Sequence, residues 1–283
     1  MDQPAYHSTA PDLVSHPSPN SWNEFSPWLV RWLLFFLISL GLGYAAVQRY
    51  DPRATPGLSD AAVYYRLVAG EEVLAREMRF RVLVPSVAKL FYKLTAKFLN
   101  NPRAVFLALL ISNAIFCATT ACLLVAIGIR VSGNLATALL GATLYLLNFA
   151  VMHLQLAGMV DAGEACLILA VVMTLFGTRW WLLPLWGVVG ALAKETFLPL
   201  AGVLALVWWY VEYRRSHDKL RKLFPVVAMI VTAAATILIL RSMIAEGTVV
   251  SDVLVQTRAS ASALGRTSVV TSPTFWYVFL WLL

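Results

Sequence analysis

The chemistry in this sequence is concentrated in a few ionisable side chains that lie beside long apolar stretches. Acidic groups in such places can accept a proton or neutralise a cation, and basic groups can hold an anion. In chain order the candidates are Asp60, Arg79, Arg81, His153, Asp161, Glu164, Lys194 and Glu195. Because charged groups are costly in apolar surroundings and tend to be functional there, we expect this set to contain the site.

The spacing of the candidates predicts how some of them meet. Asp161 and Glu164 are three residues apart and therefore share one face of a helix. Lys194 and Glu195 form a tight turn between two short apolar stretches, which suggests a turn sunk below the surface and facing a cavity.

Each candidate also has a plain structural explanation. Asp60 could cap a helix, and Asp161 with Glu164 could end a helix in the headgroup region. Lys194 and Glu195 could form an ordinary hairpin turn, and His153 could be an interfacial histidine. The functional interpretation therefore rests on the conjunction of these residues.

The composition requires a membrane around these residues. Of the 283 residues, 60% are hydrophobic and only 13% are charged, whereas soluble domains carry about 25% charged residues. The mean hydropathy is +0.73. The apolar residues form long blocks without the two-residue alternation of a membrane β-barrel. We therefore predict an all-α, polytopic bundle of about seven to eight transmembrane helices.

The apolar blocks define the domain organisation. The predicted spans are 28–47, 104–127, 135–152, 158–176, 180–193, 197–211 and 223–240. A last apolar run, 274–283, is too short to cross a hydrocarbon core of ~30 Å, so we expect a C-terminally incomplete chain or a partial helix. Residues 1–27 are polar, rich in Pro and Ser, and lack a signal-peptide pattern. We expect them to form a disordered cytosolic tail ahead of a transmembrane domain, 28–283.

The net charge of +7 bears on the binding partners of the chain, and the three cysteines bear on disulfides and metal sites. In a membrane protein, basic residues orient loops and meet anionic headgroups, so we expect membrane lipids as partners and no nucleic acid. Cys117, Cys122 and Cys166 lie in apolar stretches without metal-ligand spacing. We therefore expect neither a disulfide framework nor a zinc site.

Basic residues in the loops predict the orientation. The segment 212–222 contains five Lys and Arg, which places it and the N-terminus in the cytoplasm. Every candidate residue then falls on the extracytoplasmic side. The segment 48–103 contains ten Lys and Arg and runs against the rule, although long loops obey it less strictly.

The loop 48–103 is predicted to hold two helices that lie on the bilayer surface. The first begins at Ser59, with Asp60 in its first turn, and covers about 61–76. The second covers 84–99 and places three lysines in one stripe with four-residue spacing, namely Lys89, Lys93 and Lys97. Their ammonium groups should reach lipid phosphates, through snorkelling or through a specific contact.

Three short motifs carry a resemblance to a known family. Leu58–Tyr65 is similar to the aspartate-containing start of the first extracytoplasmic loop in the C-type (GT-C fold) membrane glycosyltransferases, and Phe80–Pro85 resembles the entry to their second surface helix. Gly190–Thr196 resembles a Lys-Glu-Thr turn of the bacterial members. The resemblance covers about residues 28–240.

The resemblance implies a transfer reaction at the outer face of a bacterial inner membrane. A polyprenyl-phosphate-linked sugar donor would pass its sugar to an extracytoplasmic acceptor. Asp60 would be the general base, and Arg81 and Lys194 would hold the donor phosphate. Asp161, Glu164 and Glu195 would bind the acceptor, orient the cations, or hold a divalent metal such as Mg or Mn.

The sequence departs from the family in its single Asp60, where many members carry paired acidic residues. Two other classes therefore remain open. A lipid or solute transporter should show paired halves, and no repeat relates 28–127 to 135–240. A non-enzymatic subunit should hold a membrane-protein partner.

Overall fold

The described residues of this computed structural model, 21–49, 59–71, 80–177, 179–215 and 219–244, are almost entirely helical and contain no strand. The α-helices are α1 (Ser21–Arg49), α2 (Ser59–Ala69), α3 (Leu83–Thr95), α4 (Asn101–Ser132), α5 (Leu135–Leu146), α6 (Asp161–Phe176), α7 (Leu183–Ala193), α8 (Phe197–Arg215) and α9 (Lys219–Ile244). A π-helical turn, η3 (Val151–Gln155), precedes α6, and a 3₁₀ turn, η4 (Trp180–Leu182), precedes α7.

The structure confirms the prediction, made from composition, of an all-helical membrane protein. Among the residues that the structure describes, three helices are long and apolar enough to cross a membrane, at Pro27–Ala45 in α1, Arg103–Ser132 in α4 and Lys222–Met243 in α9. They match three of the predicted spans. Long apolar side chains remain exposed along α1, α8 and α9, a surface that suits lipid better than water.

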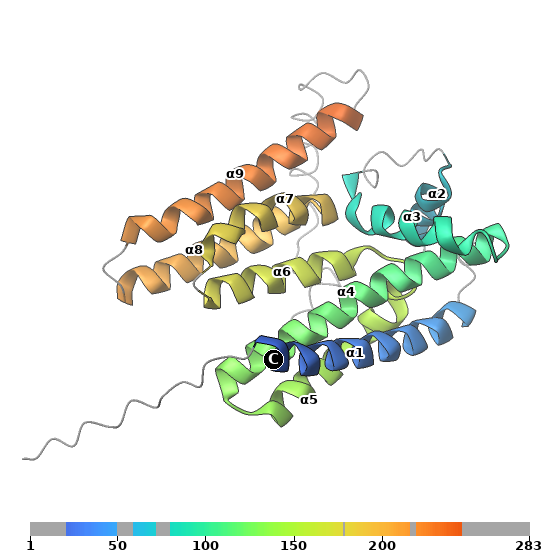
Figure 1. Cartoon of the computed structure of the whole chain (residues 1–283). Helices are drawn as coiled ribbons and strands as arrows, with labels where there is room; N and C mark the ends of the chain where they lie inside the picture. The colour runs from blue at the N-terminus through green and yellow to red at the C-terminus, as the bar shows by residue number, and fades with distance from the viewer. Residues whose placement is uncertain (1–20, 50–58, 72–79, 178, 216–218, 245–283) are drawn as a thin grey trace, which may run out of the picture.

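The bundle is built from two packed groups of helices. Figure 1 shows α1, α4, α6, α8 and α9 running roughly along one direction, with the short α2 and α3 at one end beside the first part of α4. One apolar core joins α1, α4 and α5, and another joins α6 to α9. A smaller core packs Val68 of α2 and Ala88 of α3 against Leu109 of α4. This third core fixes the two short helices to the bundle.

Both predicted surface helices are shorter in the structure than expected. Helix α2 stops at Ala69, because Gly70 adopts a left-handed backbone with φ of +81°. The amides of Gly70 and Glu71 then bond back to the carbonyls of Leu67 and Arg66, an arrangement that ends a helix. Residues 72–76 of the predicted helix lie outside the described part of the chain.

Helix α3 ends at Thr95, four residues before the predicted end at 99. The Thr95 hydroxyl donates to the Ala104 carbonyl of α4, 3.2 Å away, in addition to carbonyls of its own helix. Lys97 therefore lies in the turn after α3 instead of sharing a helix with Lys89 and Lys93. All three lysines are exposed.

The predicted spans 135–152 and 158–176 are also divided differently. Helix α5 ends at Leu146, and Asn148 accepts a bond from the Ala150 amide at 2.8 Å. The side chain of Asn148 thereby competes with the helical hydrogen bonds. Gly158, with φ of +115°, lies between the π-helical turn and α6, so α6 begins only at Asp161.

Helices α7 and α9 are in close contact at Gly187 in the second helix group. A methyl group at Gly187 would clash with the Met229 carbonyl oxygen and the Thr232 hydroxyl of α9. Thr232 also donates to the Pro184 carbonyl at 3.0 Å. The absence of a side chain at Gly187 lets the two helices share this bond.

Replacing Gly187 should therefore loosen the pairing of α7 with α9. We expect Gly187→Ala to lower the free energy of unfolding by about 1–3 kcal/mol, as overpacking of a close contact does. The measurement is unfolding in mixed micelles. Gly141→Ala is the matched control, because a methyl group there meets nothing within 4 Å. Equal changes in the free energy of unfolding for Gly187→Ala and Gly141→Ala would contradict the close contact of α7 with α9.

Candidate functional site

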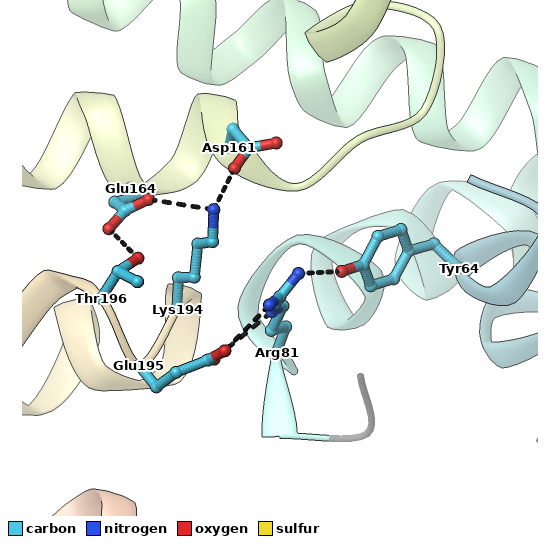
Figure 2. Close-up of polar contacts among 7 residues, drawn as sticks. All are labelled: Tyr64, Arg81, Asp161, Glu164, Lys194, Glu195 and Thr196. Atoms are coloured by element: carbon cyan, nitrogen blue, oxygen red, sulfur yellow. Dashed lines mark hydrogen bonds and ion pairs between the residues drawn. The ribbon is translucent and has the colours of Figure 1, made fainter. Parts of the chain in front are cut away.

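Five of the predicted residues form one polar cluster at the end of the bundle where α2 and α3 lie. Its members are Arg81, Asp161, Glu164, Lys194 and Glu195, joined by Tyr64 and Thr196. Figure 2 shows these side chains converging from α2, the segment before α3, the start of α6 and the α7–α8 turn. We call this set the charged cluster.

The first turn of α6 lies close to α3 and to the end of α7, next to the charged cluster. Gly163 lies in the first turn of α6, and a methyl group there would lie 2.9 Å from Val84 of α3 and 3.8 Å from Ala193 of α7. A side chain at this position would require the Val84 side chain to move. Asp161 and Glu164 flank this contact and share one helical face, as their spacing predicts.

The α7–α8 turn owes its shape to a second glycine. The ring of Phe197, fully buried, occupies the space where a side chain at Gly190 would stand. The backbone of Lys194 is extended, and its carbonyl accepts a hydrogen bond from the Phe197 amide at 3.1 Å. The chain reverses over three residues, and the side chains of Lys194 and Thr196 reach α6 while that of Glu195 reaches Arg81.

Arg81 is held on two sides. Its Nη2 and Nε donate to the two carboxylate oxygens of Glu195 at 2.8 and 3.3 Å, a forked pairing. Its Nη1 donates to the Tyr64 hydroxyl at 2.9 Å. Burial by itself would lower the pKa of Arg81, but the bonds to Glu195 and Tyr64 outweigh it and raise the pKa. The guanidinium is therefore firmly charged and oriented.

Lys194 lies between two carboxylates of α6. Its Nζ bonds to Asp161 and lies 3.6 Å from the Glu164 carboxylate, whose other oxygen accepts from the Thr196 hydroxyl. Burial disfavours the ammonium, yet the bond to Asp161 and the charges of both carboxylates raise the pKa of Lys194 above its ordinary value. The charge of Arg81 acts in the opposite sense, so the two cations are close enough to interact.

Glu195 and Tyr64 complete the electrostatics of the charged cluster. Burial alone would raise the pKa of Glu195, but the bond from Arg81 and the nearby cations lower it, so the carboxylate stays ionised. Burial raises the pKa of Tyr64 despite the opposing charge of Arg81. With two cations and three carboxylates, the charged cluster carries a net charge of −1.

Asp60 and His153 are described by the structure but are not members of the charged cluster. Asp60 is in the first turn of α2, one turn before Tyr64, and its charge acts on the Tyr64 hydroxyl together with that of Asp161. His153 lies on the π-helical turn, with its ring 4.7 Å from that of Phe149. Arg79 lies outside the described residues.

The three lysines of the predicted surface stripe are not part of the charged cluster. Lys89, Lys93 and Lys97 project from α3 and the following turn on the exposed surface. No group of three or more His, Cys, Asp or Glu that could hold a metal ion occurs within the described part of the chain.

Sequence reasoning missed three residues near the site. Tyr64 and Thr196 were inside the motifs, and the four-residue spacing of Tyr64 from Asp60 was the signal that places both on one helical face. Arg241 of α9 lies over the ring of Phe80, 5.8 Å from its centroid, and Phe80 directly precedes Arg81 in the chain. No local pattern in the sequence links Arg241 to that segment.

Comparison with known proteins gives no match: no protein-family model, curated protein or solved structure is similar to this chain. Function must therefore be argued from the charged cluster itself.

Removing the central cation tests whether the cluster is an electrostatic unit. In Lys194→Met, Asp161 and the buried Glu164 would face each other without a counter-charge. We expect the free energy of unfolding in mixed micelles to fall by about 1–3 kcal/mol. Lys89→Met, at an exposed lysine, should change it by less than about 0.5 kcal/mol. A loss no greater than in the control would show that Lys194 does not balance these carboxylates.

Proposed function

We propose that the chain is an integral membrane glycosyltransferase of the C type, which moves a sugar from a polyprenyl-phosphate-linked donor to an extracytoplasmic acceptor. One observation carries the proposal. Ionisable residues from four separate segments, which include all three motifs that resemble this family, meet at one end of an apolar helical bundle. Charged groups gathered in such surroundings are costly, and function is the usual reason for them.

The proposed topology places this cluster outside the cytoplasm of a bacterial inner membrane. Helices α1 and α4–α9 would provide seven spans, and the N-terminus would be cytoplasmic. Helices α2 and α3 would lie at the outer interface. This placement is supported by the exposed apolar side chains Leu90 and Leu94 of α3 and Phe98 in the turn after it, each of which directly follows an exposed lysine in the chain.

Each residue then has a role in a displacement at the anomeric carbon. Asp60 takes the proton of the acceptor hydroxyl as that oxygen attacks the anomeric carbon. The bond from this carbon to the phosphate oxygen breaks, and the polyprenyl phosphate leaves with its electrons. Arg81 and Lys194 stabilise its charge. Asp161 and Glu164 orient Lys194, and Tyr64 orients Arg81.

A second candidate is a non-enzymatic subunit of a membrane complex. It is favoured by the finding that both cations of the charged cluster already have carboxylate partners within the chain. A cluster of this kind would act as a structural lock between α3, α6 and the α7–α8 turn. In that case Asp60 would only stabilise the start of α2, where an acidic side chain suits the helix dipole.

The variant Asp60→Asn separates the two candidates. It keeps the shape of the side chain but replaces the carboxylate with an amide that cannot act as a base, so an enzyme should lose transfer by about 10²–10⁴-fold. The measurement is transfer of radiolabelled sugar from polyprenyl-phosphate donors to membrane-fraction acceptors, with the protein level checked by blotting. Glu71→Gln, at an exposed residue, is the control. Undiminished transfer in Asp60→Asn would remove Asp60 as the base.

A further inference from the structure

The pairing of Arg81 with Glu195 has the geometry of anion recognition. The guanidinium presents Nη2 and Nε to two oxygens at 2.8 and 3.3 Å. A phosphate group offers two oxygens in a similar arrangement and is bound by arginine in the same forked way. Glu195 therefore occupies the position on Arg81 that a phosphate would occupy.

The side chains of Arg81 and Glu195 differ in how firmly their other contacts hold them. Arg81 remains bonded to the hydroxyl of Tyr64, whose side chain is fully buried between α2, α3 and the segment before α6. Glu195 projects from a turn, and its side chain is 31% exposed, against 17% for Arg81. If the pair opened, Arg81 would stay oriented and Glu195 would turn towards water.

Lys194 differs from Asp161 in exposure in much the same way, 19% against 31%, but it has a second carboxylate partner in Glu164. Two carboxylates from the first turn of α6 flank it, and one of these is fixed in turn by the Thr196 hydroxyl. An incoming anion would have to displace Asp161 and Glu164 together. Arg81 is therefore the cation of the charged cluster that can exchange its partner at the lower cost.

We propose that Glu195 is a built-in counter-ion that holds Arg81 until a phosphate group takes its place. The exchange binds the phosphate on an arginine already oriented by Tyr64, and it releases the α7–α8 turn from the segment before α3. The inference rests on the proposed function, because the phosphate it concerns is that of the polyprenyl-phosphate-linked donor. The inference adds to the proposed function that the donor phosphate must displace Glu195 from Arg81.

The test is phosphate binding to the purified full chain in phosphatidylcholine nanodiscs, measured by calorimetry with farnesyl phosphate and, separately, with inorganic pyrophosphate. Glu195→Gln removes the competing charge while keeping the side-chain shape. Because partly exposed ion pairs contribute up to about 1 kcal/mol, the affinity should rise about three- to fivefold. Glu212→Gln breaks the similarly exposed pair with Lys222 elsewhere in the chain and should leave binding unchanged.

Arg81→Gln should abolish the binding, and Arg81→Lys, which keeps a charge but not the fork, serves if the first variant does not fold. A gain for farnesyl phosphate alone identifies a lipid phosphate as the ligand. A gain for both probes supports the exchange for phosphate groups in general.

Two results would overturn the exchange. One of them leaves the proposed donor site intact, and the other contradicts that site as well. If binding depends on Arg81 but Glu195→Gln does not strengthen it, the exchange is wrong and the donor site survives. If no variant binds either probe in an Arg81-dependent way, the exchange and the proposed donor site are both wrong.

Discussion

The fold depends on how a strongly apolar chain accommodates charges among its helices. An isolated ionised group loses several kcal/mol of hydration when it leaves water, so each such group needs a partner of opposite sign. Here the partners come from different segments: Arg81 before α3 pairs with Glu195, and Lys194 pairs with Asp161 and Glu164 of α6. Satisfying these charges fixes how α2 and α3 sit against the start of α6 and the α7–α8 turn.

Close packing makes this pairing geometrically feasible. Gly163 lets α3 and α7 approach the first turn of α6, and Gly190 gives the ring of Phe197 room, so that the turn can reverse tightly. Tyr64 connects the buried side of α2 to Arg81 and thereby places Asp60, one turn earlier, near the same charges. Apolar packing and ion pairing therefore position the same few residues.

The sequence predicts the coarse fold well, because long apolar blocks in a chain with few charges have few alternatives to membrane helices. Counting spans also predicts that Arg81, Asp161 and Lys194 lie on the same side of the membrane, where they can meet. It could not predict the forked bond to Glu195 or the contact of Arg241 with Phe80, which depend on tertiary packing. The helix ends at Ala69, Thr95 and Leu146 were missed because glycine and local side-chain bonds override apolar periodicity there.

The central claim is that these separated charges share one face of the membrane, opposite the Glu212–Lys222 pair, and it is tested most directly by labelling single cysteines. In a background without Cys117, Cys122 and Cys166, the variants Asp60→Cys, Glu195→Cys and Glu212→Cys are exposed in intact cells to a membrane-impermeant thiol reagent. The account predicts labelling of the first two, and labelling of the third only after the cells are permeabilised. Labelling of Asp60→Cys and Glu195→Cys from opposite sides would contradict it.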